Sequence, residues 1–558
     1  MNPDPTLATA RASRDWHPVT LLALLAAWLA TAGNLPLWST IARLPETRGW
    51  HAWLNLGLLM LAFFAFLFAF LGLLVWPRWR RVVGVLLLLV VTVSSHYMLS
   101  FGVVVDPTML VNVVQTDWRE ARDLMSGALM LAILAGVGLP GWWWWRRAVR
   151  RVPPVQLAFQ QLAAVMAALV LGMGLLWLGF QDLASLMRNH KSLRYMANPF
   201  NTVYAVGRLS ASPVARGQGP LMPVGEDARL RTTALAPAQA PLIVLVVGET
   251  ARAANFGLGG YARDTTPRLR QLHAAGDLLY FPDVRSCGTN TQTSVPCMFS
   301  HLGREAYGSS DVRHETLMDV LQRAGLATLW IDNQSGCKGV CDRIPNVETR
   351  AANDPRWCQA GECLDEIMLE ELPRQWQALD PQRRARGTVV VLHQMGSHGP
   401  AYHKRSPAAL KAFLPECERA SLPDCSPQQI VNAYDNSIRY TDHFLARTIE
   451  WLRAQNRPAA LLYVSDHGES LGERGLYLHG MPYAMAPDEQ THVPMLAWLS
   501  PSLKAARGWP ADCLRAQTGR AWSHDHLFHT VLGLAQVETQ VAKPALDILA
   551  PCATAGRL

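Results

Sequence analysis

Two apolar runs in this sequence end in side chains that could bind a metal ion. The first run begins at Pro241 and leads to Glu249, and the second begins at Ala460 and leads to Asp466 and His467. Continuous apolar runs of this length are typical of buried parallel strands. Ligands of open α/β sheets bind where such strands end, so we expect the three side chains to face one crevice.

A hydroxyl-rich segment lies between the two runs, Cys287-Gly-Thr-Asn-Thr-Gln-Thr-Ser-Val-Pro-Cys297. Two carboxylates and an imidazole suit Zn²⁺, and a hydroxyl in the fourth position would gain a lowered pKa and become a nucleophile. The part from Ser294 onward is typical of a helix start, whose amides favour a phosphoryl anion. These residues indicate nucleophilic phosphoryl transfer, with Thr289, Thr291 and Ser294 open as the nucleophile.

The composition of the chain changes along its length. Its 558 residues are too many for one core, so we expect at least two domains. Long apolar runs dominate up to about Gln181, and an ordinary charged sequence follows from Pro241. The runs are near the length that a bilayer requires and predict five membrane spans: Val19 to about Ala32, Leu54 to Val75, Val82 to Phe101, Gly127 to Trp145 and Val155 to Phe180.

The arginines beside these spans predict their orientation, because Lys and Arg are retained in the cytoplasm. One set of loops holds nine arginines, and the opposite set holds four beside several acids: Arg11, Arg14, Arg78, Arg80, Arg81, Arg146, Arg147, Arg150 and Arg151, against Arg43, Arg48, Arg119 and Arg122. The N-terminus is therefore expected inside, and everything after Gln181 outside. The net charge of +8 partly reflects these clusters, and no nucleic-acid motif accompanies it, so we expect no nucleic-acid partner.

The ten cysteines all lie at or after Cys287, on the predicted outer side. Eight fall in short-spaced pairs, which predict disulfides: Cys287/Cys297, Cys337/Cys341, Cys358/Cys363 and Cys417/Cys425. Free thiols or a zinc knuckle are the alternatives, but the pairs have no neighbouring histidine ligands. Cys513 and Cys552 are candidates for a fifth bridge.

We divide the chain into a transmembrane domain of five helices (1–181), a linker with interfacial helices (182–240) and an outer α/β domain (241–558). The outer domain alternates short apolar runs with longer helix-like segments, which predicts a mainly parallel sheet with helices on both faces. The expected strands are Leu242 to Val247, Ala327 to Ile331, Thr388 to Leu392, Leu461 to Val464 and Met495 to Leu499.

The outer loop between the third and fourth spans carries polar residues at a helical spacing. Asn112, Thr116 and Glu120 recur every four residues and would form one stripe on a helix. Spacing alone favours a solvated helix face.

Several motifs together give a specific resemblance that covers essentially the whole chain. The sequence resembles the phosphoethanolamine transferases of Gram-negative inner membranes, the group with the lipid A modifying and colistin resistance enzymes, in the alkaline phosphatase and sulfatase superfamily. The resemblance rests on five spans followed by Val247-Gly-Glu-Thr-Ala-Arg252, Cys287-Gly-Thr-Asn-Thr291, Ser294-Val-Pro-Cys-Met-Phe-Ser300, Gly396-Ser-His-Gly-Pro400 and Ser465-Asp-His-Gly-Glu-Ser470.

This resemblance implies roles for individual residues. Thr291 would be the nucleophile, and Glu249, Asp466 and His467 would hold zinc with it. His398 and His479 would contact the transferred phosphate or a second zinc, so one or two zinc ions are expected. Lys338 would lie near the substrate, and His393 is closer to a core or supporting residue. The family assigns Asn112, Thr116 and Glu120 to the donor head group, which reverses the interpretation from spacing.

The resulting hypothesis is a zinc-dependent enzyme of the Gram-negative inner membrane with a periplasmic catalytic domain. It would move phosphoethanolamine from phosphatidylethanolamine, through a phospho-Thr291 intermediate, to a phosphate of lipid A in lipopolysaccharide, and so give polymyxin resistance. The alternatives are transfer to core sugars or periplasmic glucans, or glycerol phosphate transfer by a related membrane enzyme. A noncatalytic membrane sensor is a third hypothesis, against which the intact Glu249, Thr291, Asp466 and His467 set argues.

Overall fold

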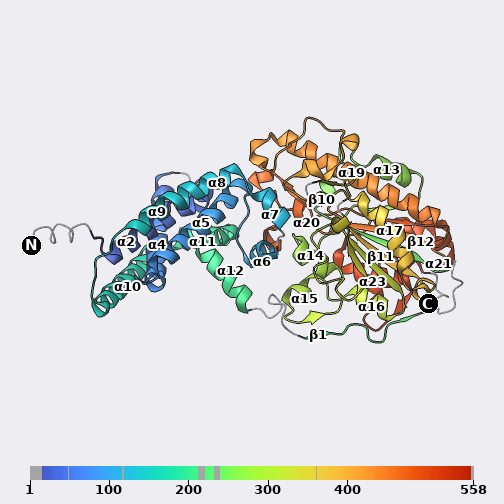
Figure 1. Cartoon of the computed structure of the whole chain (residues 1–558), viewed down its shortest axis with the longest axis horizontal. Helices are drawn as coiled ribbons and strands as arrows, with labels where there is room; N and C mark the ends of the chain where they lie inside the picture. Colours follow the sequence, from blue (N-terminus) through green and yellow to red (C-terminus); the bar gives the residue numbers. More distant parts are fainter. Residues whose placement is uncertain are drawn as a thin grey trace, which may run out of the picture. The chain divides into compact units, whose positions relative to one another are not determined.

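The structure is a computed structural model, and it describes residues 15–553 except 48, 116–117, 212–219, 232–238, 353 and 360. Its residues divide into two compact units (Figure 1). The helical unit comprises Met1–Leu110 and Met125–Gly207, and the sheet unit comprises Val111–Leu124 and Arg208–Leu558.

The helical unit contains five helical segments long and apolar enough to span a membrane, as the sequence predicts. They are Pro18–Ala42 (α2 Pro18–Ala30 and α3 Leu35–Ala42), α4 Trp50–Leu74, α5 Arg80–Phe101, Gly127–Arg146 (α8 Gly127–Ile133 and α9 Leu139–Arg146) and α10 Pro154–Leu178. The first span is longer than predicted, because the chain continues past Ala32 through a short 3₁₀ turn into α3. Pro36 has no amide proton, which suits it to the first turn of α3 and not to the middle of one continuous helix.

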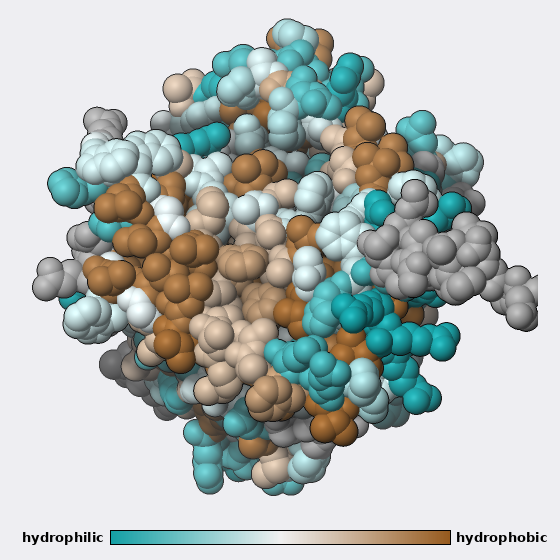
Figure 2. Space-filling view, turned by 90° about the vertical axis from the view of Figure 1, so that its left-hand side faces the viewer, coloured by the Kyte–Doolittle hydropathy of each residue, from teal (hydrophilic) through white to brown (hydrophobic). Residues whose placement is uncertain are grey.

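Packing between these helices leaves much of their apolar surface uncovered. Gly72 of α4 lets α10 approach closely, since a β-carbon there would lie 2.5 Å from Val165 Cγ2. Gln161 of α10 donates to the carbonyl of Gly72 at 2.6 Å, so its buried amide is paired. Other apolar side chains of the unit, such as Leu131, Phe159 and Val170, are exposed. Brown apolar patches are visible on the face shown in Figure 2. Outward apolar side chains of this kind suit a lipid solvent.

Shorter helices follow the third and the fifth spans. Between the third and fourth spans lie α6 (Pro107–Gln115) and α7 (Trp118–Leu124), and Asp106 accepts a hydrogen bond from Met109 N in the first turn of α6. After the fifth span come α11 (Phe180–Asn189), a 3₁₀ segment (Lys191–Met196) and α12 (Phe200–Ala211).

The sheet unit is built on a seven-stranded sheet in the order β4-β15-β12-β3-β11-β7-β8. All five predicted strands are present: β3 Leu242–Gly248, β7 Ala327–Asp332, β11 Thr388–His393, β12 Ala459–Ser465 and β15 Met495–Leu499. Only β15 runs against the other strands of this sheet, so the prediction of a mainly parallel sheet is confirmed. The two edge strands, β4 (Leu278–Phe281) and β8 (Asn346–Glu348), were not predicted, since four and three residues carry little periodic signal.

Helices cover both faces of this sheet, as predicted (Figure 1). On one side lie α13 (Pro267–Ala274), α17 (Glu366–Ala378) and the long α19 (Pro427–Ala454); on the other lie α16 (Leu317–Arg323) and α23 (Leu527–Ala535). Every residue of β3 is buried, which explains why its sequence reads as one apolar run. Alternate residues face opposite layers, so Ile243, Leu245 and Val247 pack in the core beneath α16 and α23.

All ten cysteines are joined in disulfides. The bridges are Cys287–Cys297, Cys337–Cys341, Cys358–Cys363, Cys417–Cys425 and Cys513–Cys552. Four of them close loops of ten residues or fewer. They therefore fix local loops of the sheet unit, and the fifth joins α22 (Ala511–Thr518) to the end of the described chain.

Candidate active site

The adjacent strands β3 and β12 bring the two predicted carboxylates together. Their parallel register aligns Ser465 with Gly248, so Asp466 and Glu249 follow at the same edge of the sheet. Backbone contacts hold this junction: Asp466 N donates to Gly248 O at 2.8 Å, and Thr250 N donates to Asp466 Oδ1 at 3.1 Å. Both carboxylates are fully buried.

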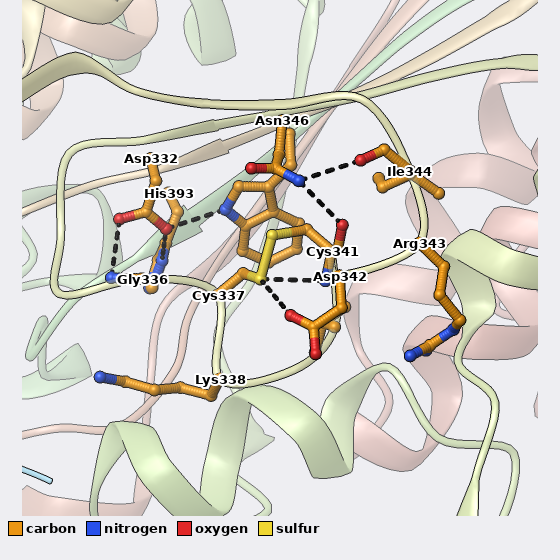
Figure 3. Close-up of a disulfide and its surroundings, with 12 residues drawn as sticks. Asp332, Gly336, Cys337, Lys338, Cys341, Asp342, Arg343, Ile344, Asn346 and His393 are labelled. Atoms are coloured by element: carbon orange, nitrogen blue, oxygen red, sulfur yellow. Dashed lines mark hydrogen bonds and ion pairs between the residues drawn. A yellow bond between two sulfur atoms is a disulfide. The ribbon is translucent and has the colours of Figure 1, made fainter. Parts of the chain in front are cut away.

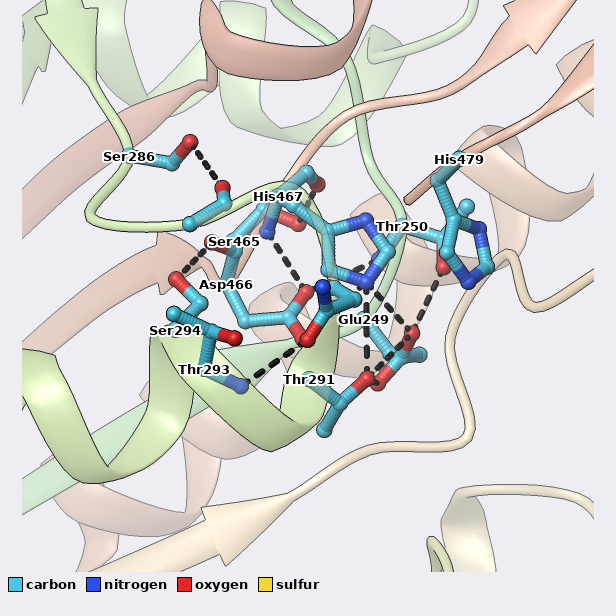
Figure 4. Close-up of polar contacts among 12 residues, drawn as sticks. Glu249, Thr250, Ser286, Thr291, Thr293, Ser294, Ser465, Asp466, His467 and His479 are labelled. Carbon is cyan, nitrogen blue, oxygen red and sulfur yellow. Dashed lines mark hydrogen bonds and ion pairs between the residues drawn. The ribbon is translucent and has the colours of Figure 1, made fainter. Parts of the chain in front are cut away.

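His467 completes a three-residue cluster with these carboxylates (Figure 4). Its Nε2 lies 3.3 Å from Glu249 Oε1 and 3.4 Å from Asp466 Oδ2. Its Nδ1 lies 2.9 Å from the carbonyl oxygen of Gly468, which suits a proton on Nδ1 and leaves Nε2 to face the carboxylates. The ring is therefore held in the orientation that a metal ligand needs.

Thr291 is the hydroxyl of the segment from Cys287 to Cys297 that contacts this cluster. It is the first residue of α14 (Thr291–Met298), and Asn290 caps that helix by accepting a hydrogen bond from Thr293 N. Its Oγ1 lies 3.0 Å from Glu249 Oε2 and 3.4 Å from His467 Nε2. Thr291 thus stands at a helix N-terminus, a position that favours a bound anion.

The two alternative hydroxyls are engaged elsewhere. Thr289 Oγ1 donates to the carbonyl of Met481 at 2.7 Å. Ser294 Oγ donates to the carbonyl of Asp466 and lies 3.3 Å from His524 Nδ1. It therefore contacts the backbone at the end of β12. Neither hydroxyl has a contact with the Glu249 carboxylate or the His467 ring among the described hydrogen bonds.

Burial and mutual charge shift the ionisation of the cluster. Burial lowers the pKa of His467, but the charges of Asp466 and Glu249 outweigh it and raise the pKa to about 10. Burial and the charge of Glu249 raise the pKa of Asp466 to about 6. Burial also acts to raise the pKa of Glu249, yet the hydrogen bond and charge of His467 hold it well below its usual range. Two buried carboxylates thus require a positive charge beside them.

The donor set fits a metal ion. The ligand atoms of Glu249, Asp466 and His467 lie within 4.8 Å of one another. Asp466 Oδ2 is buried and accepts no hydrogen bond from the described residues, so it has a free lone pair for a cation. Two carboxylates and one imidazole, with the Thr291 hydroxyl beside them, are ligand types that a four-coordinate zinc ion accepts.

His479 and His398 lie beside this cluster. The ring of His479 is centred 4.3 Å from that of His467 and 5.8 Å from that of His398. His479 Nδ1 lies 2.8 Å from Glu469 Oε2, which orients the ring. The structure therefore places His479 next to His467, and His398 next to His479.

Lys338 and His393 occupy a second neighbourhood, around the Cys337–Cys341 disulfide (Figure 3). Lys338 Nζ donates to the hydroxyl of Ser335 at 2.7 Å, so its charge is held within its own loop. His393 is fully buried in β11, and its Nδ1 lies 2.9 Å from Asp332 Oδ2. The Asp332 carboxylate also accepts a hydrogen bond from Gly336 N, which fixes the loop that follows β7 to the end of that strand. His393 is thus a core residue, as predicted.

The predicted stripe between the third and fourth spans is only partly described. Asn112 lies on α6, and α7 begins at Trp118. Thr116 and the Glu120 side chain lie outside the described residues. Residues 111–124 belong to the sheet unit by their contacts.

Three supporting residues were missed from the sequence. Thr250 Oγ1 donates to Glu249 Oε1 at 2.6 Å, and its positive φ of 61° is unusual for a β-branched residue. Ser465 Oγ accepts from Ala251 N and donates to the His467 carbonyl. His524 accepts from Cys287 N through Nδ1, while its Nε2 lies 2.9 Å from the Ser465 carbonyl oxygen. Thr250 and Ser465 stand inside the quoted motifs, whereas His524 lies in none.

Two family models match the chain. The model described as "Sulfatase" matches residues 241–537, and the model described as "Phosphoethanolamine transferase EptA/EptB" matches residues 63–213. The first covers the central strands and the cluster of Glu249, Asp466 and His467, and the second covers most of the helical unit.

Similar proteins cover most of the chain. A "Phosphoethanolamine transferase EptA" of Salmonella typhimurium is 38% identical over 488 residues, 85% of this chain and 86% of the relative. A "Phosphatidylethanolamine transferase Mcr-1" of Escherichia coli is 35% identical over 500 residues, 87% of this chain and 90% of the relative.

A solved structure agrees with both matches. An integral membrane lipooligosaccharide phosphoethanolamine transferase A of Neisseria meningitidis is 34% identical, with a TM-score of 0.91 over 97% of this chain and 99% of that one. Its separately solved soluble domain is 40% identical and covers 60% of this chain. The chain therefore belongs to the phosphoethanolamine transferase family, within the alkaline phosphatase and sulfatase superfamily.

Proposed function

We propose that this enzyme moves phosphoethanolamine from phosphatidylethanolamine to a phosphate of lipid A, through a covalent intermediate on Thr291. The observation that carries the proposal is the position of Thr291 Oγ1, 3.0 Å from Glu249 Oε2 and 3.4 Å from His467 Nε2 at the start of a helix. A hydroxyl held between a metal ligand set and helix amides is suited to attack a phosphodiester.

In the first half-reaction, Thr291 Oγ1 forms a bond to the phosphorus of the donor lipid. The bond from phosphorus to the diacylglycerol oxygen breaks, and the diacylglycerol leaves with a proton. Glu249 and His467 hold Thr291 in line, and the first turn of α14 faces the negative phosphoryl oxygens. His479, oriented by Glu469, is placed to contact the same group.

In the second half-reaction, an oxygen of the acceptor phosphate attacks the same phosphorus. The bond to Thr291 Oγ1 breaks, and the hydroxyl regains a proton. Thr291 is thus free for another cycle. The first step forms the bond between Thr291 Oγ1 and phosphorus, and the second step breaks it at the same site. A single cluster therefore serves both substrates.

Zinc is the metal that we propose for this site, bound by Glu249, Asp466, His467 and Thr291. When bound, zinc supplies a positive charge that lowers the pKa of the Thr291 hydroxyl and balances the developing charge of the phosphoryl group. The buried carboxylates support this proposal, because they need a cation and Asp466 Oδ2 has no hydrogen-bond partner among the described residues.

The names of the relatives support the choice of substrates. Mcr-1 is named a phosphatidylethanolamine transferase, which supports this donor, and the Neisseria meningitidis protein is named for lipooligosaccharide. A further relative, matching 46% of this chain, is named a Kdo(2)-lipid A phosphoethanolamine transferase. We carry these substrates to this chain as part of the proposal.

We also propose that the enzyme resides in the Gram-negative inner membrane, with its N-terminus cytoplasmic and its sheet unit periplasmic. Support comes from the arginine-rich loops on one side, the odd number of candidate spans and five disulfides in the sheet unit. Adding an ammonium beside each lipid A phosphate weakens attraction for polycationic peptides, so expression should raise the polymyxin concentration that kills the host.

Intact-protein mass spectrometry of the full-length enzyme with phosphatidylethanolamine vesicles tests the intermediate. We expect a phosphoethanolamine adduct on the wild type and on Thr289→Ala, and none on Thr291→Ala. An adduct that persists on Thr291→Ala would move the nucleophile to another hydroxyl. Lipid A from cells that express the wild type should gain phosphoethanolamine. An adduct on the enzyme with unmodified lipid A would favour a core-sugar or glucan acceptor.

A further inference from the structure

A large cavity in the sheet unit is not used by the reaction described above. Its volume is about 820 Å³, and it is lined by the hairpin of Cys358 and Cys363, by Met395 and Gly396 after β11, and by residues 403–408 and 411. This volume is ample for a disaccharide, since small-molecule sites commonly measure about 300–1,000 Å³. We propose that this cavity binds the phosphorylated sugar of the acceptor, an inference that rests on the proposed function.

The cavity shares part of its wall with the backbone that contacts Glu249. Met395 and Gly396 form part of its wall, immediately before Ser397 and His398. Gly396 has a positive φ of 52°, and a β-carbon on it would lie 2.6 Å from the Glu249 carbonyl oxygen. The backbone at Gly396 thus touches Glu249 and also lines the cavity. A ligand there would be separated from the metal cluster by little more than one stretch of backbone.

The outer part of the wall is cationic. The side chains of Arg356, Lys404 and Lys411 line the cavity and are 64%, 33% and 18% exposed. Lys404 and Lys411 pair with carboxylates that lie deeper: Asp123 is 11% exposed, Glu362 9% and Glu416 3%. Arg356 pairs instead with Asp354, which is 27% exposed. The exposed guanidinium of Arg356 and the two half-buried ammonium groups present donors to an incoming phosphate.

The inner wall offers partners for a sugar. Trp357 and Tyr440 supply flat aromatic surface. Trp357 Nε1, His403 Nδ1 and Ser406 Oγ are buried and have no hydrogen-bond partner in the part of the chain that the structure describes. Each unpaired polar group is costly, and a ligand with several hydroxyls would supply partners for them. Aromatic surface with a few polar groups and cations is the lining expected for a phosphorylated sugar.

The chain ties this wall to the start of a candidate span. Lys404 Nζ, on the cavity wall, donates to Asp123 Oδ1 at 2.7 Å, and both residues belong to the sheet unit. Asp123 precedes Gly127, where the fourth candidate span begins, by four residues. Four residues extend over about 14 Å at most.

The test separates the two half-reactions of the full-length enzyme in vesicles. Arg356→Ala removes an exposed cation of the cavity, and Arg374→Ala is the matched control, because Arg374 is equally exposed and pairs with a neighbouring acid, Glu371, away from the cavity. We expect Arg356→Ala to raise the KM for lipid A about tenfold, the effect of losing one charge-assisted hydrogen bond. Adduct formation on Thr291 from phosphatidylethanolamine should stay at the wild-type rate, and the control should match the wild type throughout.

Trp357→Phe keeps an aromatic ring and removes the indole N–H donor. We therefore expect a smaller rise in the KM for lipid A. Equal loss of both half-reactions, or no change in either, would overturn the cavity as the acceptor site. A disaccharide bisphosphate should inhibit acceptor transfer at far lower concentration than inorganic phosphate. Equal inhibition by the two would show that the cavity takes free phosphate and not a sugar. Absence of any wild-type adduct would instead refute the proposed function.

Discussion

The two units of this enzyme place apolar side chains in opposite ways. In the sheet unit, the longest apolar runs form the centre of a sheet, and β3 and β12 have no exposed residue. In the helical unit, equally apolar helices such as α10 expose much of their surface, as Val155 and Trp177 do. The difference shows that hydropathy alone does not predict burial: lipid is the solvent of one unit, and water of the other.

Polar chemistry follows the same division. The sheet unit buries Glu249, Asp466 and His467 completely, at the ends of two adjacent central strands. In the helical unit, buried polar side chains such as Gln161 and Asn34 donate to backbone carbonyls. We therefore expect chemistry to depend on the sheet unit and access to lipid to depend on the helical unit, and the following experiments test that division.

The largest effect should come from removing one metal ligand. We expect Asp466→Asn to lower the rate of adduct formation on Thr291 about 1,000-fold or more, because the site would hold its metal and the Thr291 hydroxyl poorly. Dialysis against a chelator should give the same loss, and zinc should restore the wild type only. Asp277→Asn, which changes an exposed acid paired with Arg453, should have no effect. Full activity in the chelated enzyme would rule out a metal centre.

Separating the two units should be the next largest perturbation. We expect residues from about Pro241 onward to fold as a soluble, disulfide-bonded domain, because that part contains the central sheet and all five bridges. It should hydrolyse a small chromogenic phosphodiester and fail to transfer from phosphatidylethanolamine vesicles. Circular dichroism checks its folding. Efficient transfer from vesicles by this domain would contradict the division of labour.

The sequence predicted the parts of the site that rest on long, buried strands. Glu249, Asp466 and His467 follow apolar runs whose burial leaves a clear signal, and their strands proved to be neighbours in register. The five spans were predictable for a similar reason, since each needs about 20 apolar residues.

The remaining parts depend on tertiary contacts. His524 reaches the site through Cys287 N and the Ser465 carbonyl, and nothing near it in sequence marks that contact. Thr289 and Thr291 have the same chemistry, and only the orientation of α14 turns one of them toward Glu249. Edge strands β4 and β8 were missed because they are short and depend on pairing with β15 and β7.

Truncating one leucine in each unit compares how much a buried and an exposed apolar side chain contribute to stability. Leu245→Ala in β3 removes a fully buried side chain and should lower the free energy of unfolding by about 2–5 kcal/mol. Leu131→Ala changes a side chain that is 69% exposed on α8, and should change stability by about 0.5 kcal/mol or less. Thermal melts in detergent, followed by near-ultraviolet circular dichroism, measure both. Equal losses would mean that Leu131 packs against protein in the membrane.

The smallest effect concerns protonation within the sheet unit. Burial, with Lys543 and His301 nearby, lowers the pKa of His529 to about 4, against about 6.5 in the unfolded chain. Between these values the unfolded state binds more protons, so this residue contributes stability that is complete above pH 6.5 and is lost as the pH falls toward 4. His529→Gln keeps an acceptor for Lys543 N and does not titrate. It should reduce the stability that is lost between pH 6.5 and pH 4 by about 1 kcal/mol, after allowance for screening by solvent. Comparing the two slopes cancels the groups that both proteins share. Identical slopes would mean that this ring already titrates normally in the folded enzyme.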